Sequence, residues 1–169
     1  MNYPTAEIKD DVAKCCELLS AYGDTSFEGF DEYIKKNNPE RLEEVYTATF
    51  DVNAVCHLDV GYVLFGEDYK RGEMLVHLSR AHNAVQNRWG TELPDHLPNV
   101  LNLLPLMQDR VEREDLVKKM VHPAVRKMIE SFDKNPEKAN AYRFALETVD
   151  RVFVQDFGEP EPFPEVENE

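Results

Sequence analysis

Apolar residues recur at helical spacing along nearly the whole chain, and this pattern restricts the possible folds more than any other feature. From Tyr69 to Trp89, for example, the apolar side chains fall three or four positions apart, as on one face of a helix. No stretch alternates apolar and polar residues convincingly over the length of a strand. Only seven glycines occur among 169 residues, so tight hairpin turns lack their usual residues. The sequence therefore predicts an all-α fold, a single-domain helical bundle of about seven to nine helices.

Prolines and capping residues indicate where several of these helices begin. Asn38 and Asn135 each precede a proline, which is typical of a helix start because the first helical residue needs no N–H donor. Asp109 is expected to cap a further helix, and Pro123 to kink or restart it. Another helix is expected from about Ala54.

The chain is strongly acidic. Its 33 Asp and Glu residues outnumber 19 Lys and Arg, which gives a net charge of −14. Nucleic acids and anionic membranes would be repelled by such a surface, so the charge argues against a general binder of either. A cationic partner, or simply good solubility, accounts for the charge.

Residues 1–157 are predicted to form the helical domain, and residues 158–169 an acidic tail rich in proline. Residues 156–169 contain six acids, three prolines and no Lys or Arg. Segments of this composition bury little apolar surface and stay disordered or loosely tethered. Removing the tail is therefore expected to leave the melting temperature nearly unchanged.

The sequence gives no sign of a metal or a cofactor. The three cysteines form neither a disulfide framework nor a C-x-x-C pair, and the five histidines lack the H-E-x-x-H spacing of a metal-binding helix. The N-terminus shows no signal peptide, and no apolar run approaches the roughly 20 residues of a membrane span. A cytoplasmic protein, either a monomer or a homodimer, is the expectation.

The segment ELPDHLP, residues 92–98, is the most distinctive polar stretch. Its two prolines fix the backbone, so Asp95 and His96 are presented from a rigid connection between two helices. One interpretation is that Asp95 only caps the next helix, which aspartate does readily. The other is that this acidic corner, together with Glu92, receives a positively charged group.

Aromatic and acidic residues also stand out earlier in the sequence, around Asp51 and just before the polar stretch from Glu67 to Gly72. Tyr46, Phe50 and Tyr62 supply aromatic area, and Asp51 adds a carboxylate. Core packing is the ordinary role of aromatic residues at helical spacing. A groove of aromatic and acidic side chains would instead suit a peptide that carries arginines and apolar residues. Arg71 is expected to pair with Glu67 or Asp51 of the chain itself.

Three motifs follow one another in a characteristic order. Y-x-x-T-F-D begins at Tyr46, LFGEDYKRGEMLVHL begins at Leu64, and ELPDHLP precedes the apolar run VLNLLPLM, which ends at Met107. Over this region the chain resembles the nitrate-reductase delta-subunit (NarJ-like) chaperones, within the broader TorD-like family of redox-enzyme maturation chaperones. The pair Asp95 and His96 also resembles the acid–histidine pair that the TorD branch has in this loop. The TorD branch has an acid after the motif, whereas this chain has Asn99.

The resemblance implies an all-α, non-catalytic chaperone of the cytoplasm. Such chaperones bind the N-terminal segment, often a twin-arginine signal or its remnant, of the catalytic subunit of a molybdopterin-dependent oxidoreductase. They hold that subunit until molybdenum cofactor and iron–sulfur clusters are inserted. The peptide-binding residues expected here are Asp95, His96 and Glu92 at the polar end, Asp51 nearby, and Tyr46, Phe50 and Tyr62 for apolar contact.

Two other functions are compatible with the sequence. A permanent small subunit or scaffold of the same kind of enzyme complex would use a larger and more apolar surface. A helical-bundle enzyme would use Asp95 and His96 as an acid–base pair, because a carboxylate can orient a histidine. Adjacent residues seldom point at one another, however, and the motif contains no nucleophile.

Overall fold

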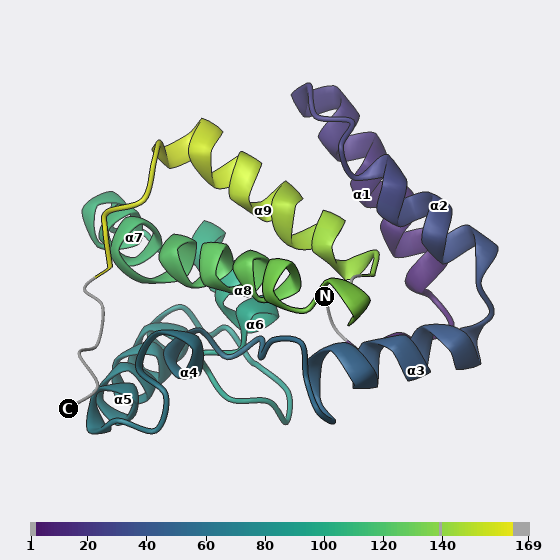
Figure 1. Ribbon diagram of the computed structural model, residues 1–169. Helices are drawn as coiled ribbons and strands as arrows, with labels where there is room; N and C mark the ends of the chain where they lie inside the picture. Colours follow the sequence, from purple (N-terminus) through teal and green to yellow (C-terminus); the bar gives the residue numbers. More distant parts are fainter. Residues whose placement is uncertain (1–2, 139, 164–169) are drawn as a thin grey trace. The chain divides into compact units, whose positions relative to one another are not determined.

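The computed structural model describes residues 3–138 and 140–163, and its regular structure is helical (Figure 1). The α-helices are α1 (Ile8–Tyr22), α2 (Glu28–Lys36), α3 (Pro39–Phe50), α4 (Val60–Phe65), α5 (Tyr69–Ala84), α6 (Leu97–Leu103), α7 (Arg110–Leu116), α8 (His122–Lys134) and α9 (Tyr142–Phe157). Three shorter helical turns are η1 (Leu104–Leu106), η2 (Val117–Val121) and η3 (Pro136–Lys138). The prediction of an all-α helical bundle is confirmed.

Contacts divide the chain into two compact units, each built from two separate stretches of sequence. The first unit comprises Met1–Cys56 and Ile129–Arg151, and the second comprises His57–Met128 and Val152–Glu169. Two of the boundaries fall inside α8 and α9 rather than in linkers. The helical pattern continues across both boundaries, so the sequence gives no sign of these two units, and the expectation of one domain over residues 1–157 stays a prediction.

An aromatic cluster forms the core of the first unit, in which α1 and α2 lie side by side (Figure 1). Tyr142 of α9 contacts Phe30 of α2 and Tyr46 and Phe50 of α3, with ring centroids 5.3, 5.7 and 5.1 Å away. All four side chains are buried. Tilted and edge-on aromatic pairs at such distances contribute about 0.5–1.5 kcal/mol beyond the area they bury. The core-packing interpretation therefore holds for Tyr46 and Phe50.

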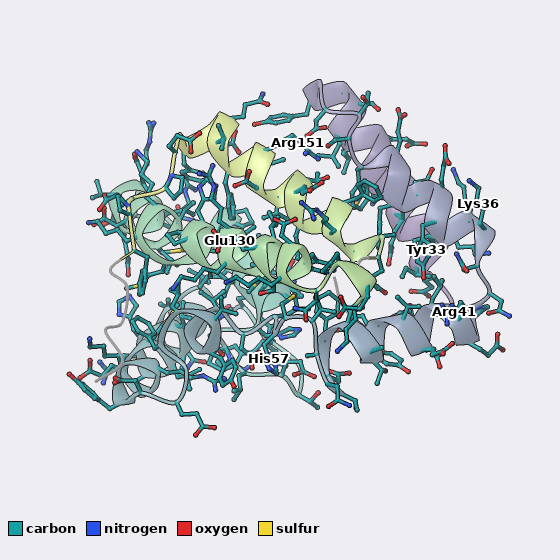
Figure 2. The ribbon with its side chains drawn as sticks, in the orientation of Figure 1. Tyr33, Lys36, Arg41, His57, Glu130 and Arg151 are labelled. Atoms are coloured by element: carbon teal, nitrogen blue, oxygen red, sulfur yellow. The ribbon has the colours of Figure 1, made fainter. Side chains whose placement is uncertain are left out.

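Ion pairs on the surface of the first unit are exposed. Lys36 and Arg41 project outward from α2 and α3 (Figure 2), where they pair with neighbouring acids at 3.0 and 2.7 Å. Arg151 of α9 donates to the carboxylate of Asp24 at 3.3 Å and to the hydroxyl of Ser26. Exposed pairs of this kind contribute about 0–1 kcal/mol each, so the aromatic core accounts for more of the stability of this unit.

Branched aliphatic side chains dominate the core of the second unit, where α4 packs on α5 and on η2. Among those that are at most 2% exposed are Leu64, Leu78, Leu97, Val100, Leu103, Val117 and Val121. They come from α4, α5, α6 and η2, so these elements hold one another in place. This packing also fixes the polar segment that directly precedes α6.

A proline shapes the long helical stretch of α7, η2 and α8. Proline at position 123 has no N–H, and its ring would clash with a carbonyl one turn earlier. The chain widens into the π-helical turn η2 before it, and the His122 N–H donates to the carbonyl of Val117 rather than to that of Lys118. At Pro123 the structure therefore has a π turn where a kink was expected, and α7, η2 and α8 follow one another without a loop between them.

Several predicted helix ends are confirmed and others are wrong. Asn38 caps α3 by accepting the Arg41 N–H, and Asp109 caps α7, both as predicted. The helix expected from Ala54 begins only at Val60, and the one expected to reach Trp89 ends at Ala84.

Local hydrogen bonds explain two of the corrected helix ends. At the end of α5 the backbone of Gln86 has φ 55°, and the Asn87 N–H turns back to the carbonyl of His82. The Asn135-Pro136 pair opens only the turn η3. A side-chain cap at Asn140 then starts α9, where it accepts the Tyr142 N–H at 3.0 Å.

Residues 158–163, which we call the C-terminal strap, are docked in the second unit. Gly158 ends α9 in the left-handed region, with φ 84°. Glu159 pairs with Arg126 at 2.7 Å, and the ring of Phe163 lies 5.4 Å from that of Phe65. The expectation of a loosely tethered tail is therefore wrong for these six residues, and its remainder, residues 164–169, lies outside the described residues. Within the described residues, no helix is both long enough and apolar enough to cross a membrane.

Candidate functional site

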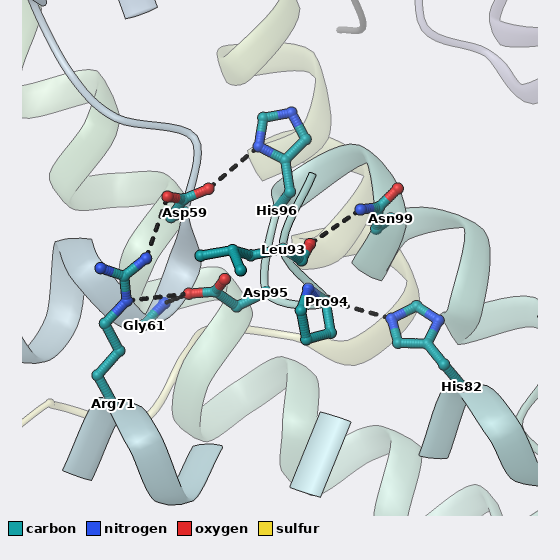
Figure 3. A network of polar contacts seen from close by, with 9 residues as sticks. All are labelled: Asp59, Gly61, Arg71, His82, Leu93, Pro94, Asp95, His96 and Asn99. Carbon is teal, nitrogen blue, oxygen red and sulfur yellow. Dashed lines mark hydrogen bonds and ion pairs between the residues drawn. The ribbon is translucent and has the colours of Figure 1, made fainter. Parts of the chain in front are cut away.

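The ELPDHLP corner is held to the start of α4 by its backbone. The Val60 N–H donates to the carbonyl of Asp95 at 2.9 Å, and the Leu97 N–H donates to the carbonyl of Leu58 at 2.8 Å. These two bonds pair Asp59 with His96 as a single antiparallel bridge. The side chains of both residues are thereby brought to one place (Figure 3).

Asp95 caps a helix, although not the one that follows it. Its carboxylate Oδ2 accepts the N–H of Gly61, in the first turn of α4, at 3.1 Å. The N-cap residue of α4, Asp59, makes no such bond with its own side chain. The helix that follows the corner, α6, has His96 as its N-cap residue. Asp95 therefore supplies, from a distant position in the sequence, the cap that α4 lacks.

Arg71 of α5 connects the two acids of the corner (Figure 3). Its guanidinium lies 3.1 Å from the carboxylate of Asp59 and 3.6 Å from that of Asp95. It also lies over the ring of Tyr62, 5.2 Å from the centroid. Asp95 is fully buried, and the side chain of Arg71 is 19% exposed. The cation that this acidic corner receives in the structure is the chain's own arginine, and the pairing expected with Glu67 or Asp51 is wrong.

The two carboxylates respond in opposite ways to this environment. Burial, with the nearby charge of Asp59, raises the pKa of Asp95. The hydrogen bond from His96 is the largest cause of the lowered pKa of Asp59, and the charge of Arg71 adds to it. One oxygen of Asp95, Oδ1, is buried without a hydrogen bond. The charge of Arg71 lowers the pKa of both carboxylates, so at Asp95 it opposes the effect of burial.

Two further side chains, His82 and Asn99, hold the loop from its other side (Figure 3), and Asn87 holds His82. His82 lies 3.1 Å from the carbonyl of Pro94, and Asn87 donates to its other ring nitrogen at 2.9 Å. Because a carbonyl can only accept, Nε2 of His82 carries a proton. Because Nδ1 accepts the hydrogen bond from Asn87, it carries none, and the ring is neutral. Burial, which lowers the pKa of His82, favours the same state. The amide of Asn99 donates to the carbonyl of Leu93 at 2.9 Å, a bond that an acid at this position could not donate.

Gly61 and Gly72 are a matched pair for testing how tightly the corner is built. A Cβ at Gly61 would lie 2.9 Å from Oδ2 of Asp95 and 3.1 Å from Arg71, whereas a Cβ at Gly72 would meet nothing within 4 Å. We expect Gly61→Ala to lower the free energy of unfolding by about 1–3 kcal/mol, as overpacking does. Gly72→Ala should raise it by about 0.5–1 kcal/mol, because alanine favours a helix. Urea unfolding followed by circular dichroism measures both, and a Gly61→Ala variant as stable as the parent would contradict this geometry.

The predicted site residues of the second unit are brought together in part. Asp95 and His96 are both buried, and His96 faces Asp59 at 3.1 Å rather than Asp95. Because neither side chain is exposed, we place no peptide contact on either of them. Glu92 is exposed and Tyr62 is half-buried, and a peptide contact at these two stays a prediction.

The predicted site residues of the first unit belong mainly to its core. Tyr46 and Phe50 are each 5% exposed and pack in the aromatic cluster. Asp51 follows the last residue of α3 and is exposed. The apolar contacts expected of Tyr46 and Phe50 are therefore contacts inside the protein.

An open groove in the second unit offers a surface that the sequence analysis did not identify. We call it the α5–α7 groove; it has a volume of about 810 Å³ and lies between α5 on one side and α7 with η2 on the other. Met74 and Leu78 form buried parts of its lining, and Phe65, Leu116 and Met120 are half-buried there. Its volume falls within the range of about 300–1,000 Å³ that is usual for ligand sites.

Acidic side chains surround this apolar lining. Four carboxylates and two lysines line the groove: Glu73, Asp109, Glu112, Asp115, Lys70 and Lys119. Lys119 pairs with Asp115 at 2.8 Å, and His77 of α5 faces Glu112 of α7 at 3.5 Å. Tyr69 and Val111 are each 71% exposed. An apolar groove with an acidic rim suits an amphipathic segment that carries positive charge.

The sequence contains a signal for this groove, although a weak one. Leu116 and Met120 lie one helical turn apart before Pro123 and form a second apolar face beside Val117 and Val121, which enter the core. On α5 the exposed Tyr69 and the adjacent Glu73 lie one turn apart. Apolar residues on a second face of a helix are the pattern that would have pointed to the groove.

No family model matches the chain, and no curated protein matches it significantly. Within the described residues, no group of three or more His, Cys, Asp or Glu side chains could hold a metal ion.

Proposed function

We propose that this chain is a NarJ-like chaperone that binds the N-terminal segment of the catalytic subunit of a molybdopterin-dependent oxidoreductase. The segment is a twin-arginine signal or its remnant, and the α5–α7 groove receives it. In the cytoplasm the chaperone assists the insertion of molybdenum cofactor and iron–sulfur clusters into that subunit. These groups belong to the client enzyme, and the proposed task of this chain is binding.

The groove is the observation that carries the proposal. It combines an apolar lining with four carboxylates, so it can bury the apolar face of a peptide helix while its rim meets arginines. The net charge of −14 would also speed the encounter with a cationic segment. The order of the three motifs between Tyr46 and Met107 supports the choice of client class.

The ELPDHLP corner has a different task in this proposal. Asp95 caps α4, and Arg71 ties that cap to α5. Since α5 is one wall of the groove and Phe65 at the end of α4 is part of its lining, the corner positions the groove. The motif that carries the family resemblance would thus act through structure rather than through direct contact with the peptide.

Photocrosslinking tests where the peptide binds. We would place benzoylphenylalanine at Val111, on the groove rim, and in a second variant at Leu18, a comparably exposed residue of α1. The ligand is a synthetic peptide from the N-terminus of a molybdopterin oxidoreductase catalytic subunit, with a scrambled peptide of the same composition as its control. We expect crosslinks from Val111 to the natural peptide and few from Leu18.

The opposite pattern would contradict the proposal. Equal crosslinking of the natural and scrambled peptides would indicate attraction by charge alone. Crosslinking of a mature, cofactor-loaded enzyme in preference to the peptide would favour a permanent subunit over a chaperone.

A further inference from the structure

The C-terminal strap contacts the wall of the α5–α7 groove without lining its interior. Phe163 touches Phe65, which is part of the groove lining, at a centroid distance of 5.4 Å. The N–H of Glu161 donates to the carbonyl of Lys118 at 3.0 Å, in the π turn η2 that contributes Lys119 and Met120 to the groove. The strap and the groove therefore share two structural elements, α4 and η2.

The sequence explains why the strap docks at this carbonyl. In a π turn the carbonyl of Lys118 would accept an N–H from position 123, but that residue is proline and has none. The His122 N–H is directed to Val117 instead. In the strap, prolines at 160 and 162 leave Glu161 with the N–H between them, and this N–H reaches Lys118.

Side chains add to this backbone contact. The ammonium group of Lys127 lies 5.0 Å from the centroid of the Phe163 ring, and Arg126 pairs with Glu159. Each of these contacts belongs to a weak class, since the ion pair is largely exposed and the cation–π pair lies at the surface. Ordering the backbone of the strap costs conformational entropy, which opposes the stabilisation that these contacts provide.

We propose that the C-terminal strap is an allosteric brace of the α5–α7 groove. Docked, it satisfies the carbonyl of Lys118 and supports Phe65, which keeps α4 and η2 in the geometry that forms the groove. The strap does not line the cavity, so a ligand in the groove need not displace it. By reciprocity, a ligand that favours this geometry must also favour the docked strap. This inference rests on the proposed function, because the groove must bind a peptide for the coupling to be seen.

The test uses the full chain and a defined probe. The probe is a synthetic peptide of about 20 residues with leucines on one helical face and arginines beside them. Phe163→Ala should weaken probe binding roughly 5- to 20-fold, within the usual range of allosteric coupling, and Phe163→Tyr should retain most of the affinity. Hydrogen exchange at the Glu161 N–H reports docking directly in the unaltered chain, and we expect saturating probe to slow it.

Each outcome decides between the alternatives. Equal probe affinity in the parent and Phe163→Ala chains, with unchanged exchange at Glu161, would overturn the brace and leave the proposed function standing. Tighter binding by Phe163→Ala with faster exchange at Glu161 would also overturn it, because the strap would then be a competitor. A probe that fails to bind the unaltered chain would refute the groove as a peptide site and the brace with it. Should Phe163→Ala fail to fold, the exchange measurement on the unaltered chain still decides.

Discussion

Replacing Arg71 with methionine is expected to lower the free energy of unfolding by about 3–5 kcal/mol, the range for removing one partner of a buried ion pair. The guanidinium lies 3.1 Å from Asp59 and 3.6 Å from Asp95, and the Asp95 side chain is fully buried. Methionine fills much of the same volume but leaves Asp95 charged, buried and close to a second carboxylate. The loss therefore comes from an uncompensated charge rather than from a cavity.

The pH dependence of this variant has a definite sign. Burial already raises the pKa of Asp95, and without Arg71 the pKa must rise further. A carboxyl whose pKa is raised by folding favours the folded state when protonated. Its contribution is present at low pH and is lost as the pH rises through the interval between its unfolded and folded pKa values. Arg71→Met should therefore be less destabilised near pH 5 than near pH 8, relative to the parent chain.

A second substitution distinguishes charge from packing. Adding Asp95→Asn to Arg71→Met removes the uncompensated charge and keeps an oxygen that can accept the Gly61 N–H. The double variant should recover about 1–3 kcal/mol, a coupling typical of residues in contact. Arg80→Met, at an exposed position of the same helix, should change stability by less than about 0.5 kcal/mol. Urea unfolding followed by circular dichroism and by Trp89 fluorescence measures all of these, and an additive double variant would contradict the account.

The fold class was predictable because it depends on a pattern that repeats. Apolar spacing, Asn38 before a proline, and Asp109 before a polar turn are local signals, and the structure confirms each of them. The start of α4, which was predicted wrongly, involves a contact that is not local. Asp95 accepts the N–H of Gly61 in α4 from 34 positions away, and the sequence of α4 itself contains no pattern that predicts this cap.

The candidate site was harder to predict for a related reason. The ELPDHLP segment was correctly singled out as rigid and polar, but its charge is satisfied by Arg71, 24 positions earlier in the chain. The groove forms where α5 meets α7 and η2, and only the tertiary structure brings them together. A sequence pattern indicates which faces of a helix are apolar. It does not indicate which of these faces, on different helices, will lie opposite one another in the folded protein.

Reversing two charges on the groove rim should weaken peptide binding by roughly 10- to 100-fold. In Glu73→Lys/Glu112→Lys each change removes an attraction for a peptide arginine and adds a repulsion, each worth about 0.2–1 kcal/mol at an exposed site. Glu17→Lys/Glu130→Lys is the matched control, since both residues are exposed on the first unit and the net charge changes equally. Its binding should change by less than about threefold, because neither residue lines the groove and salt screens exposed charges.

Isothermal titration of these two variants and the parent chain with the client's N-terminal peptide tests the central claim most directly. If the α5–α7 groove receives the peptide, the rim variant loses most of its affinity while the control variant keeps it, and the difference narrows as salt is added. If both variants bind like the parent, or both lose affinity equally, the groove is not the peptide site and the proposal fails.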